Sequence, residues 1–275
     1  MHRILHGTSS WSEKSWVGPF YPDKTPPGEF LAYYATHFPA VEADVTYYRI
    51  PGERMVEGWA RKTPPGFELC AKFPRSIVHG GEAARPDPEC VLVPERVGAD
   101  VERFTSVMKL LGEKCGPLVL QFPYFNKTVF GGPGEFLERL DPFLAALPAG
   151  HRYAVEVRNG AWVRPPLLKI LRKHRVALVL VELAYLPHPA KLAKQQELIT
   201  TDFAYARLIG DRKAVDAKTK TFDRLVLDKS EDLDLWATLL REIREKVPKT
   251  YAFANNHYAG HGPATIRDLL ALVEG

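Results

Sequence analysis

The chain has 275 residues, of which 45% are hydrophobic, 25% charged and 11% aromatic. This composition is ordinary for a globular protein and excludes a disordered, collagenous or coiled-coil protein. The formal net charge is +4, a mild bias that permits an anionic ligand without calling for nucleic acid. A chain of this length can bury a sizeable core without disulfides.

Cysteine spacing and hydropathy indicate the compartment. Cys70, Cys90 and Cys115 have no CxxC spacing, so the sequence contains neither a zinc-finger nor a dithiol redox motif. Near the N-terminus only Ile4 and Leu5 form an apolar run, which is shorter than the ~7–15 residues of a signal peptide. The longest strongly apolar run covers residues 176–181, far short of the ~20 residues that span a bilayer. We therefore expect a soluble, cytoplasmic protein with reduced cysteines and no membrane partner.

Short apolar, β-branched or aromatic runs alternate with longer amphipathic segments along the whole chain. The runs begin near Ile4, Val41, Phe67, Pro117, Tyr153, Val176, Phe203 and Tyr251. The expected helices cover residues 29–38, 53–62, 97–114, 134–147, 165–174, 232–247 and 263–273, with a weak, short one at 187–197. Proline and glycine fall where these helices should begin and end.

The alternation predicts a parallel sheet with helical crossovers. Eight strands in ~250 residues match an α/β fold of the (β/α)₈ TIM-barrel type. An open doubly wound sheet is the rival, but it usually has fewer strands, and no GxGxxG follows the first run. No linker divides the chain, so we expect a single TIM-barrel domain over residues 1–275, with long functional or mobile connections at 79–96 and 211–231.

Every predicted strand carries polar residues at its C-terminal end, which is where TIM barrels hold their chemistry. From the second strand to the eighth these are Glu42 and Asp44, Lys72 and Arg75, Gln121, Glu156 and Arg158, Glu182, Arg207, and Asn255, Asn256 and His257. One interpretation is a structural ion network that closes the barrel. The other, which the common location favours, is an acid–base or metal-assisted site for an anionic or polyhydroxyl ligand.

The candidate catalytic residues are Glu156, Glu42, Lys72 and His257. Glu156 lies between two valines, and a dry pocket would raise its pKa and suit a general acid or base; a salt bridge to Arg158 or Arg207 is the alternative. Lys72 suits a Schiff base or, more simply, a contact to a substrate oxyanion.

The candidate substrate-binding residues supply charge, hydrogen bonds or aromatic surface. Arginine guanidinium groups match phosphate or carboxylate geometry, although they also pair with nearby acids. Asparagine side chains equally stabilise turns at strand ends, and aromatic rings equally fill cores. The set comprises Arg75, Arg158, Arg207, Gln121, Asn255, Asn256, Asp44, Tyr47 and Trp11.

A divalent metal is left open but is not favoured. His257 with Glu42, Asp44 and Glu156 offers an oxygen-rich ligand set of the kind that suits Mg²⁺ or Mn²⁺. No HxH or HExxH spacing supports this set.

The stretches GTSSW, WVGPFYP, VEADVTYYRIP, KFPR, LVLQFP, VEVRNGAW and FANNHYAGHGP occur in this order. Together they resemble the YecE-like family, also called domain of unknown function 72, from Gly7 to about Pro263. The resemblance implies a TIM barrel with a polar site, and it brings no established reaction. Three positions depart from the family pattern, with Asp44 for the usual Asn, and Asn159 and Ile209 where histidines are usual.

These observations predict an enzyme, a hydrolase, lyase or isomerase, acting at the C-terminal end of the barrel on a small molecule that bears phosphate, carboxylate or several hydroxyls. Two alternatives stay open: a metal-assisted phosphodiesterase for nucleotides or nucleic acid, which the mild charge does not favour, and a ligand-binding protein without turnover. The oligomeric state is open as well.

Overall fold

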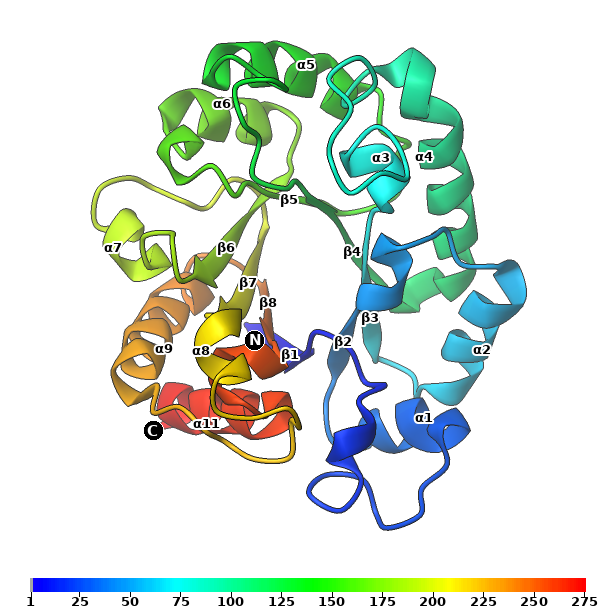
Figure 1. Cartoon of the computed structure of the whole chain (residues 1–275), viewed down its shortest axis with the longest axis vertical. Coiled ribbons are helices and arrows are strands. Elements are labelled where there is room, and N and C mark those ends of the chain that lie inside the picture. The colour runs from blue at the N-terminus through cyan, green and yellow to red at the C-terminus, as the bar shows by residue number, and fades with distance from the viewer. Residues whose placement is uncertain (1) are drawn as a thin grey trace.

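The computed structural model describes residues 2–275. Eight parallel strands form one barrel-shaped sheet, which confirms the predicted (β/α)₈ TIM barrel (Figure 1). The strands are β1 (Arg3–Thr8), β2 (Ala40–Ala43), β3 (Glu68–Lys72), β4 (Cys115–Gln121), β5 (Tyr153–Glu156), β6 (Ala177–Leu183), β7 (Phe203–Gly210) and β8 (Lys249–Ala254). The prediction of a single domain over residues 1–275, whose first residue lies outside the described ones, stays a prediction.

The barrel closes between β1 and β2, where the ladder is reduced to one isolated bridge between Ser9 and Glu42. The Tyr34 hydroxyl fills part of the gap, because it accepts from the Thr8 backbone N–H (2.7 Å) and donates to the Ala40 carbonyl (3.2 Å). Gly7 permits the close approach, since a Cβ at this position would lie 2.0 Å from the Ala40 oxygen. This closure brings Glu42 beside the end of β1.

The helices surround the strands (Figure 1). They are α1 (Phe30–Tyr34), α2 (Glu53–Lys62), α3 (Arg75–Val78), α4 (Pro94–Met108), α5 (Pro133–Ala145), α6 (Pro165–Lys173), α7 (Pro189–Ala193), α8 (Arg212–Asp216), α9 (Ser230–Arg244), α10 (Asn256–Ala259) and α11 (Gly262–Glu274). Short 3₁₀ turns cover Lys14–Trp16, Pro27–Glu29, Asp44–Tyr47, Lys109–Lys114 and Gly160–Trp162. All eight predicted helices are present, and 53–62 matches α2 at both ends.

Three helices are shorter than predicted by three residues or more. The segment 29–38 is helical only in α1, because a 3₁₀ turn precedes it and Pro39 follows within five residues. The segment 97–114 leaves α-helical geometry after Met108, and Gly112 lies in the left-handed region (φ 56°). In the segment 187–197, α7 begins after His188, whose ring nitrogen caps the Ala190 N–H. The spacing of apolar residues alone does not predict where such caps and turns end a helix.

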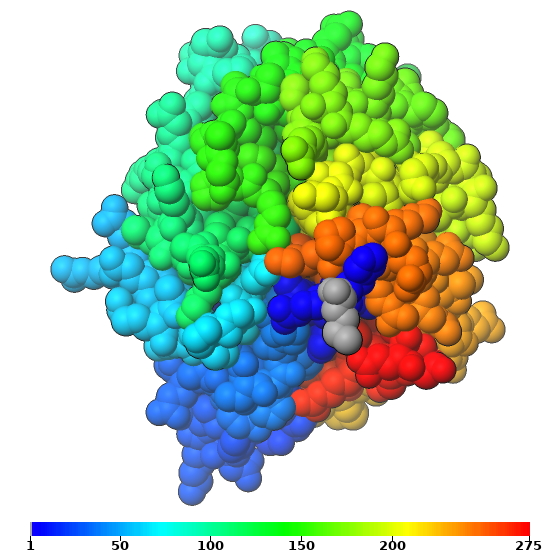
Figure 2. Space-filling view, turned by 180° about the vertical axis from the view of Figure 1, so that it is seen from behind, coloured from blue at the N-terminus to red at the C-terminus, as the bar shows by residue number. Residues whose placement is uncertain are grey.

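Alternation along the strands separates an inner core from an outer one. Inside the barrel, each strand contributes at least one apolar side chain to a common cluster. Leu5, Cys70, Val119, Val179 and Phe253 are among its members. At the N-terminal end, Glu68 accepts from Lys249, Arg152 and Tyr251 (2.6–2.7 Å). Figure 2 shows that end, with the early residues of the chain near its centre. The polar residues at the opposite end therefore lie above a packed floor.

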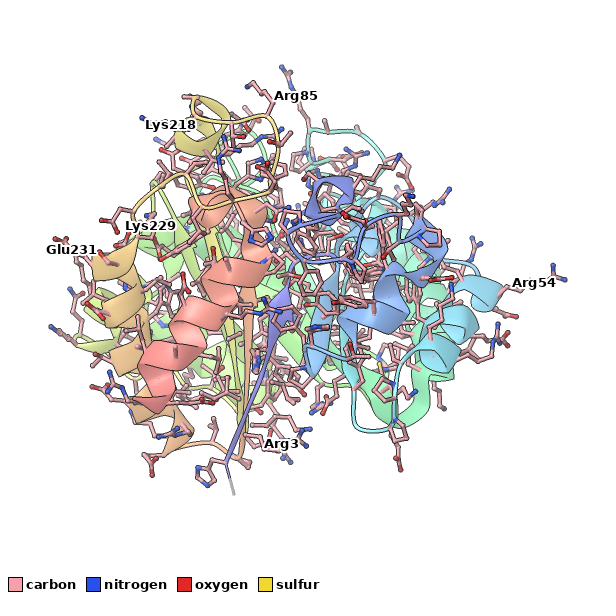
Figure 3. The ribbon with its side chains drawn as sticks, turned by 90° about the horizontal axis from the view of Figure 1, so that it is seen from below. Arg3, Arg54, Arg85, Lys218, Lys229 and Glu231 are labelled. Atoms are coloured by element: carbon pink, nitrogen blue, oxygen red, sulfur yellow. The ribbon has the colours of Figure 1, made fainter. Side chains whose placement is uncertain are left out.

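The two long connections rise at the same end of the barrel. Figure 3 shows this, with Arg85 and Lys218 at one end and Arg3 at the other. The connection 211–231 contains α8, and 79–96 has no regular element before α4. Cys70, Cys90 and Cys115 are free thiols. Within residues 2–275, no helix has the length and apolar character needed to cross a membrane.

Candidate functional site

A cavity of about 640 Å³ opens at the C-terminal ends of the strands. Its walls come from the ends of β3, β4, β6 and β7 and from the loops that follow β2, β5, β6, β7 and β8. Five basic and two acidic residues line it, together with polar and aromatic ones: Lys72, Arg158, Arg207, Arg212 and Lys213; Asp44 and Asp211; Gln121, Asn255 and His257; Tyr47, Tyr48 and Tyr185. Basic side chains therefore outnumber acidic ones in the lining of the cavity.

Arg207 lies in the floor of the cavity, held between two carboxylates. Its Nη2 donates to Glu42 Oε1 (2.8 Å), and its Nη1 donates to Glu156 Oε2 and to Gln121 Oε1 (2.8 Å). Arg207 is 1% exposed, and Glu42 and Glu156 are 0% exposed. Tyr205, two residues before Arg207 on the same face of β7, donates to Glu42 Oε2 (2.8 Å). These bonds fix the guanidinium in one orientation.

Both buried glutamates are held in the charged form. Burial raises a carboxyl pKa, but for Glu42 the charges of Arg207 and Lys72 outweigh burial and lower the pKa to about 2. For Glu156 burial is likewise outweighed, by Arg207 and Arg158, so its pKa lies below the ordinary value. The expected rise in the Glu156 pKa is therefore wrong, because its pocket is occupied by two guanidinium groups.

Lys72 lies at the boundary between the floor and the cavity. Its ammonium group pairs with Asp44 and lies 3.4 Å from Glu42 Oε1. The side chain of Lys72 is 8% exposed and that of Asp44 is 31% exposed. The prediction placed Asp44 in the second strand. This is wrong, because β2 ends at Ala43 and Asp44 begins a 3₁₀ turn. The turn still delivers the carboxylate to the cavity.

Arg158 adds a cation on the wall formed by β5. Its Nε donates to Glu156 Oε1 (2.9 Å), and its side chain is 26% exposed. Within residues 2–275 no side chain or backbone oxygen accepts from its two terminal nitrogens, and Arg158 lines the cavity. A guanidinium held by one edge in this way has its other edge free for a ligand oxygen.

Tyr47 and His257 bring groups that can exchange protons. The Tyr47 hydroxyl lies 2.8 Å from His79 Nε2, and burial and then Arg75 lower the pKa of His79 to about 4. His257 Nδ1 lies 3.1 Å from Asn255 Oδ1, which also accepts from the His257 backbone N–H. Burial lowers the pKa of His257, so its imidazole is neutral at neutral pH.

Not every predicted residue reaches this cavity. Asn256 faces away, because its Oδ1 accepts from Trp16 Nε1 (3.2 Å) and from the Gly262 N–H (2.9 Å). Arg75 and Trp11 are outside the lining. Glu182 points outward from the barrel, where it accepts from Trp236 of α9 (2.6 Å), since alternation on β6 turns Val181 and Leu183 inward.

Glu42 and Glu156 were predicted to face a substrate, and both lie beneath the lining. Glu156 meets its predicted alternative partners, Arg158 and Arg207, and bonds to both. The ion-network interpretation therefore describes these two glutamates, while Lys72 and His257 reach the cavity.

Several lining residues were missed. Tyr185, which is more than half exposed, comes from the loop after β6, and Arg212 and Lys213 come from the start of α8, where spacing gives no directional signal. Tyr205 was detectable, because it shares a strand face with Arg207.

The ligand set considered for a metal is not assembled in the described structure, because Arg207 lies between Glu42 and Glu156. Among residues 2–275 no group of three His, Cys, Asp or Glu side chains is placed to hold a metal ion.

The architecture places the chain among TIM-barrel proteins with a polar cavity at the C-terminal ends of the strands. A family model described as "Protein of unknown function DUF72" matches residues 5–275, so the chain belongs to this family. The resemblance seen in the sequence motifs is confirmed.

Named relatives and solved structures agree with this assignment. The chain is 33% identical to the UPF0759 protein YecE of Escherichia coli K12 over 156 residues, 57% of this chain and 48% of that protein. It is 26% identical to the UPF0759 protein YunF of Bacillus subtilis, over 59% of this chain and 53% of that protein. The match thus spans about half the length of each.

Solved structures extend the likeness over the whole fold. A DUF72 family protein from Thermotoga maritima is 28% identical, with full coverage of both chains and a TM-score of 0.76. A DUF72 family protein from Enterococcus faecalis is 19% identical, covers 99% of this chain and 96% of that one, and has a TM-score of 0.72. The second likeness shows the fold alone.

Proposed function

We propose that this protein is an enzyme, a hydrolase, lyase or isomerase, that acts on a small molecule bearing a phosphate or carboxylate group in the cavity at the C-terminal end of the barrel. One observation carries the proposal: Lys72, Arg158 and Arg207 are held by buried acids in fixed positions around a single cavity. Fixed cations bind an anion without paying to order their side chains first.

The geometry suggests separate roles for the floor and the lining. Glu42 and Glu156 are positioning residues, since their oxygens accept hydrogen bonds within the floor. Glu42 accepts from Arg207 and Tyr205, and Glu156 accepts from Arg207 and Arg158. Lys72 stabilises negative charge that develops on a substrate oxygen, and Asp44 orients the ammonium group. His257, neutral and at the cavity wall, accepts a proton from the substrate or from an attacking water and later returns it to the product.

Calorimetric titration with inorganic phosphate and with malonate tests anion binding. We expect Arg158→Ala to weaken binding of one or both anions at least tenfold, because a charge-assisted bond of ~1.4 kcal/mol or more is lost. Arg175→Ala is the matched control, since the Arg175 side chain is 80% exposed and pairs with Asp202 at 3.8 Å, outside the cavity lining. Failure of the unchanged protein to bind either anion at millimolar concentration contradicts the proposal, as does equal binding by both variants.

Turnover is tested once a ligand is in hand. Native mass spectrometry of the purified protein identifies a bound small molecule by mass, and that molecule is then incubated with the protein and with His257→Gln. We expect conversion by the unchanged protein, and at least a hundredfold slower conversion by the variant with binding retained. Binding without any conversion would instead make this a ligand-binding protein.

A further inference from the structure

A second compartment of about 430 Å³ adjoins the cavity. Its lining comes from the loop after β1, the turn after β2, and α2: Ser10, Trp11, Ser12, Asp44, Val45, Tyr48, Met55 and Trp59. Asp44 and Tyr48 line both compartments and therefore mark their junction. A ligand held by the cations of the first compartment can extend past Asp44 into the second.

The two compartments differ in chemistry. The first is lined by five basic residues, whereas the lining of the second contains no basic side chain and one carboxylate. Three aromatic rings, two serine hydroxyls and the apolar side chains of Val45 and Met55 complete the second lining. A second anionic group is disfavoured there, while a ring with C–H faces and several hydroxyls meets both the aromatic surfaces and the hydrogen-bonding groups.

The aromatic wall is held in place before any ligand arrives. Trp11 packs edge-to-face on Trp59 of α2, with ring centroids 5.6 Å apart, and the Trp11 carbonyl accepts from the Tyr21 hydroxyl (2.5 Å). Ser10, the residue before Trp11, has φ 110°, a conformation that a residue with a Cβ rarely adopts. Surrounding contacts must hold this loop, since such strain persists only where it is over-determined.

Tyr48 at the junction is 64% exposed. Tyr124 is exposed to the same extent but lines neither compartment. A ligand in the second compartment would cover Tyr48 and leave Tyr124 exposed, so Tyr124 is a matched control for Tyr48.

We propose that the second compartment is a sugar-binding subsite, so that the substrate class is a monosaccharide carrying a phosphate group. The phosphate lies against Lys72, Arg158 and Arg207, and the sugar ring lies between Trp11 and Tyr48. Asp44, at the junction, accepts a hydrogen bond from a sugar hydroxyl. This inference rests on the proposed anion site and adds the neutral half of the ligand.

The test compares inorganic phosphate with the 1-phosphates and 6-phosphates of glucose, galactose and mannose by calorimetric titration. We expect at least one sugar phosphate to bind ten or more times as tightly as phosphate. Trp11→Ala should remove most of this gain without changing the affinity for phosphate. Tyr48→Ala should also remove most of the gain, with a much smaller loss of phosphate affinity, because Tyr48 lines both compartments. Arg158→Ala should weaken both ligands. Tyr124→Ala is the control and should change neither.

The outcomes separate the two proposals. If phosphate binds and every sugar phosphate binds with an affinity within threefold of it, the subsite is overturned and the anion site stands. The same conclusion follows if a gain in affinity survives both aromatic variants. Absence of phosphate and sugar-phosphate binding overturns the anion site and the subsite together. Tyr48→Ala keeps the test decisive if Trp11→Ala does not fold, because the exposed Tyr48 ring contributes little to the core.

Discussion

At the scale of single residues, Glu156 is the buried anion that Arg207 and Arg158 share. Glu156→Gln should lower the free energy of unfolding by about 3 kcal/mol, because it leaves a buried guanidinium with less compensating charge. Urea unfolding of the variant beside the unchanged protein measures this.

The matched control is Glu197→Gln. Glu197 also pairs with a cation, Lys246 at 2.9 Å, but both side chains are 51% exposed, so the loss should stay below about 1 kcal/mol. Equal losses for the two variants would contradict the structural role assigned to Glu156 and would favour its prediction as a catalytic carboxylate.

At the scale of elements, closure of the barrel depends on Gly7. Gly7→Ala should destabilise the protein by about 3 kcal/mol, because the new Cβ would lie 2.0 Å from the Ala40 oxygen and 2.4 Å from the Tyr34 hydroxyl and would push β1 from β2. Thermal or urea unfolding measures the change.

Gly58→Ala in α2 makes the same chemical change where, among the described residues and apart from the adjacent residues and backbone of its own helix, no atom lies within 4 Å of the new Cβ. It should raise stability by about 0.5–1 kcal/mol, since alanine is the better helix former. If Gly7→Ala is as well tolerated as Gly58→Ala, the close β1–β2 contact is not a requirement of the fold.

At the scale of the whole molecule, stability should fall in two stages as the pH falls. Burial lowers the pKa of His79 and of His261 to about 4, from an ordinary value of 6.5. Because each histidine has a lower pKa in the folded than in the unfolded state, the unfolded state binds a proton first as the pH falls. The free energy of unfolding therefore decreases between about pH 6.5 and 4, by about 1.4 kcal/mol per pH unit for each histidine.

The second stage belongs to the carboxylates. The pKa of Glu42 is lowered from 4.5 to about 2, and that of Glu156 is also lowered, so their contribution is present above pH 4.5 and is lost as the pH falls toward 2. Urea midpoints measured from pH 7.5 to 3 record both stages. His261→Gln should flatten the first stage, and a profile unaltered by this change would refute the assignment.

The order of elements could be predicted from the sequence because apolar periodicity and proline and glycine positions are local properties of the chain. Eight strand runs separated by amphipathic segments gave the barrel, and the same periodicity placed Gln121, Glu156, Arg158 and Arg207 at strand ends. Helix limits were less accurate where a cap or a glycine in the left-handed region decides the end, as at Gly112.

The inward or outward direction of each polar side chain was decided by the tertiary structure. Glu182 and Glu156 both end predicted strands, yet the register of β6 turns Glu182 toward Trp236 while that of β5 turns Glu156 toward Arg207. Asn255 and Asn256 are neighbours, and the start of α10 sends one to the cavity and the other to Trp16. Sequence therefore determined which residues reach the C-terminal end of the barrel, and packing between distant strands determined which of them face a ligand, because a side chain's partners at that end are far away along the chain.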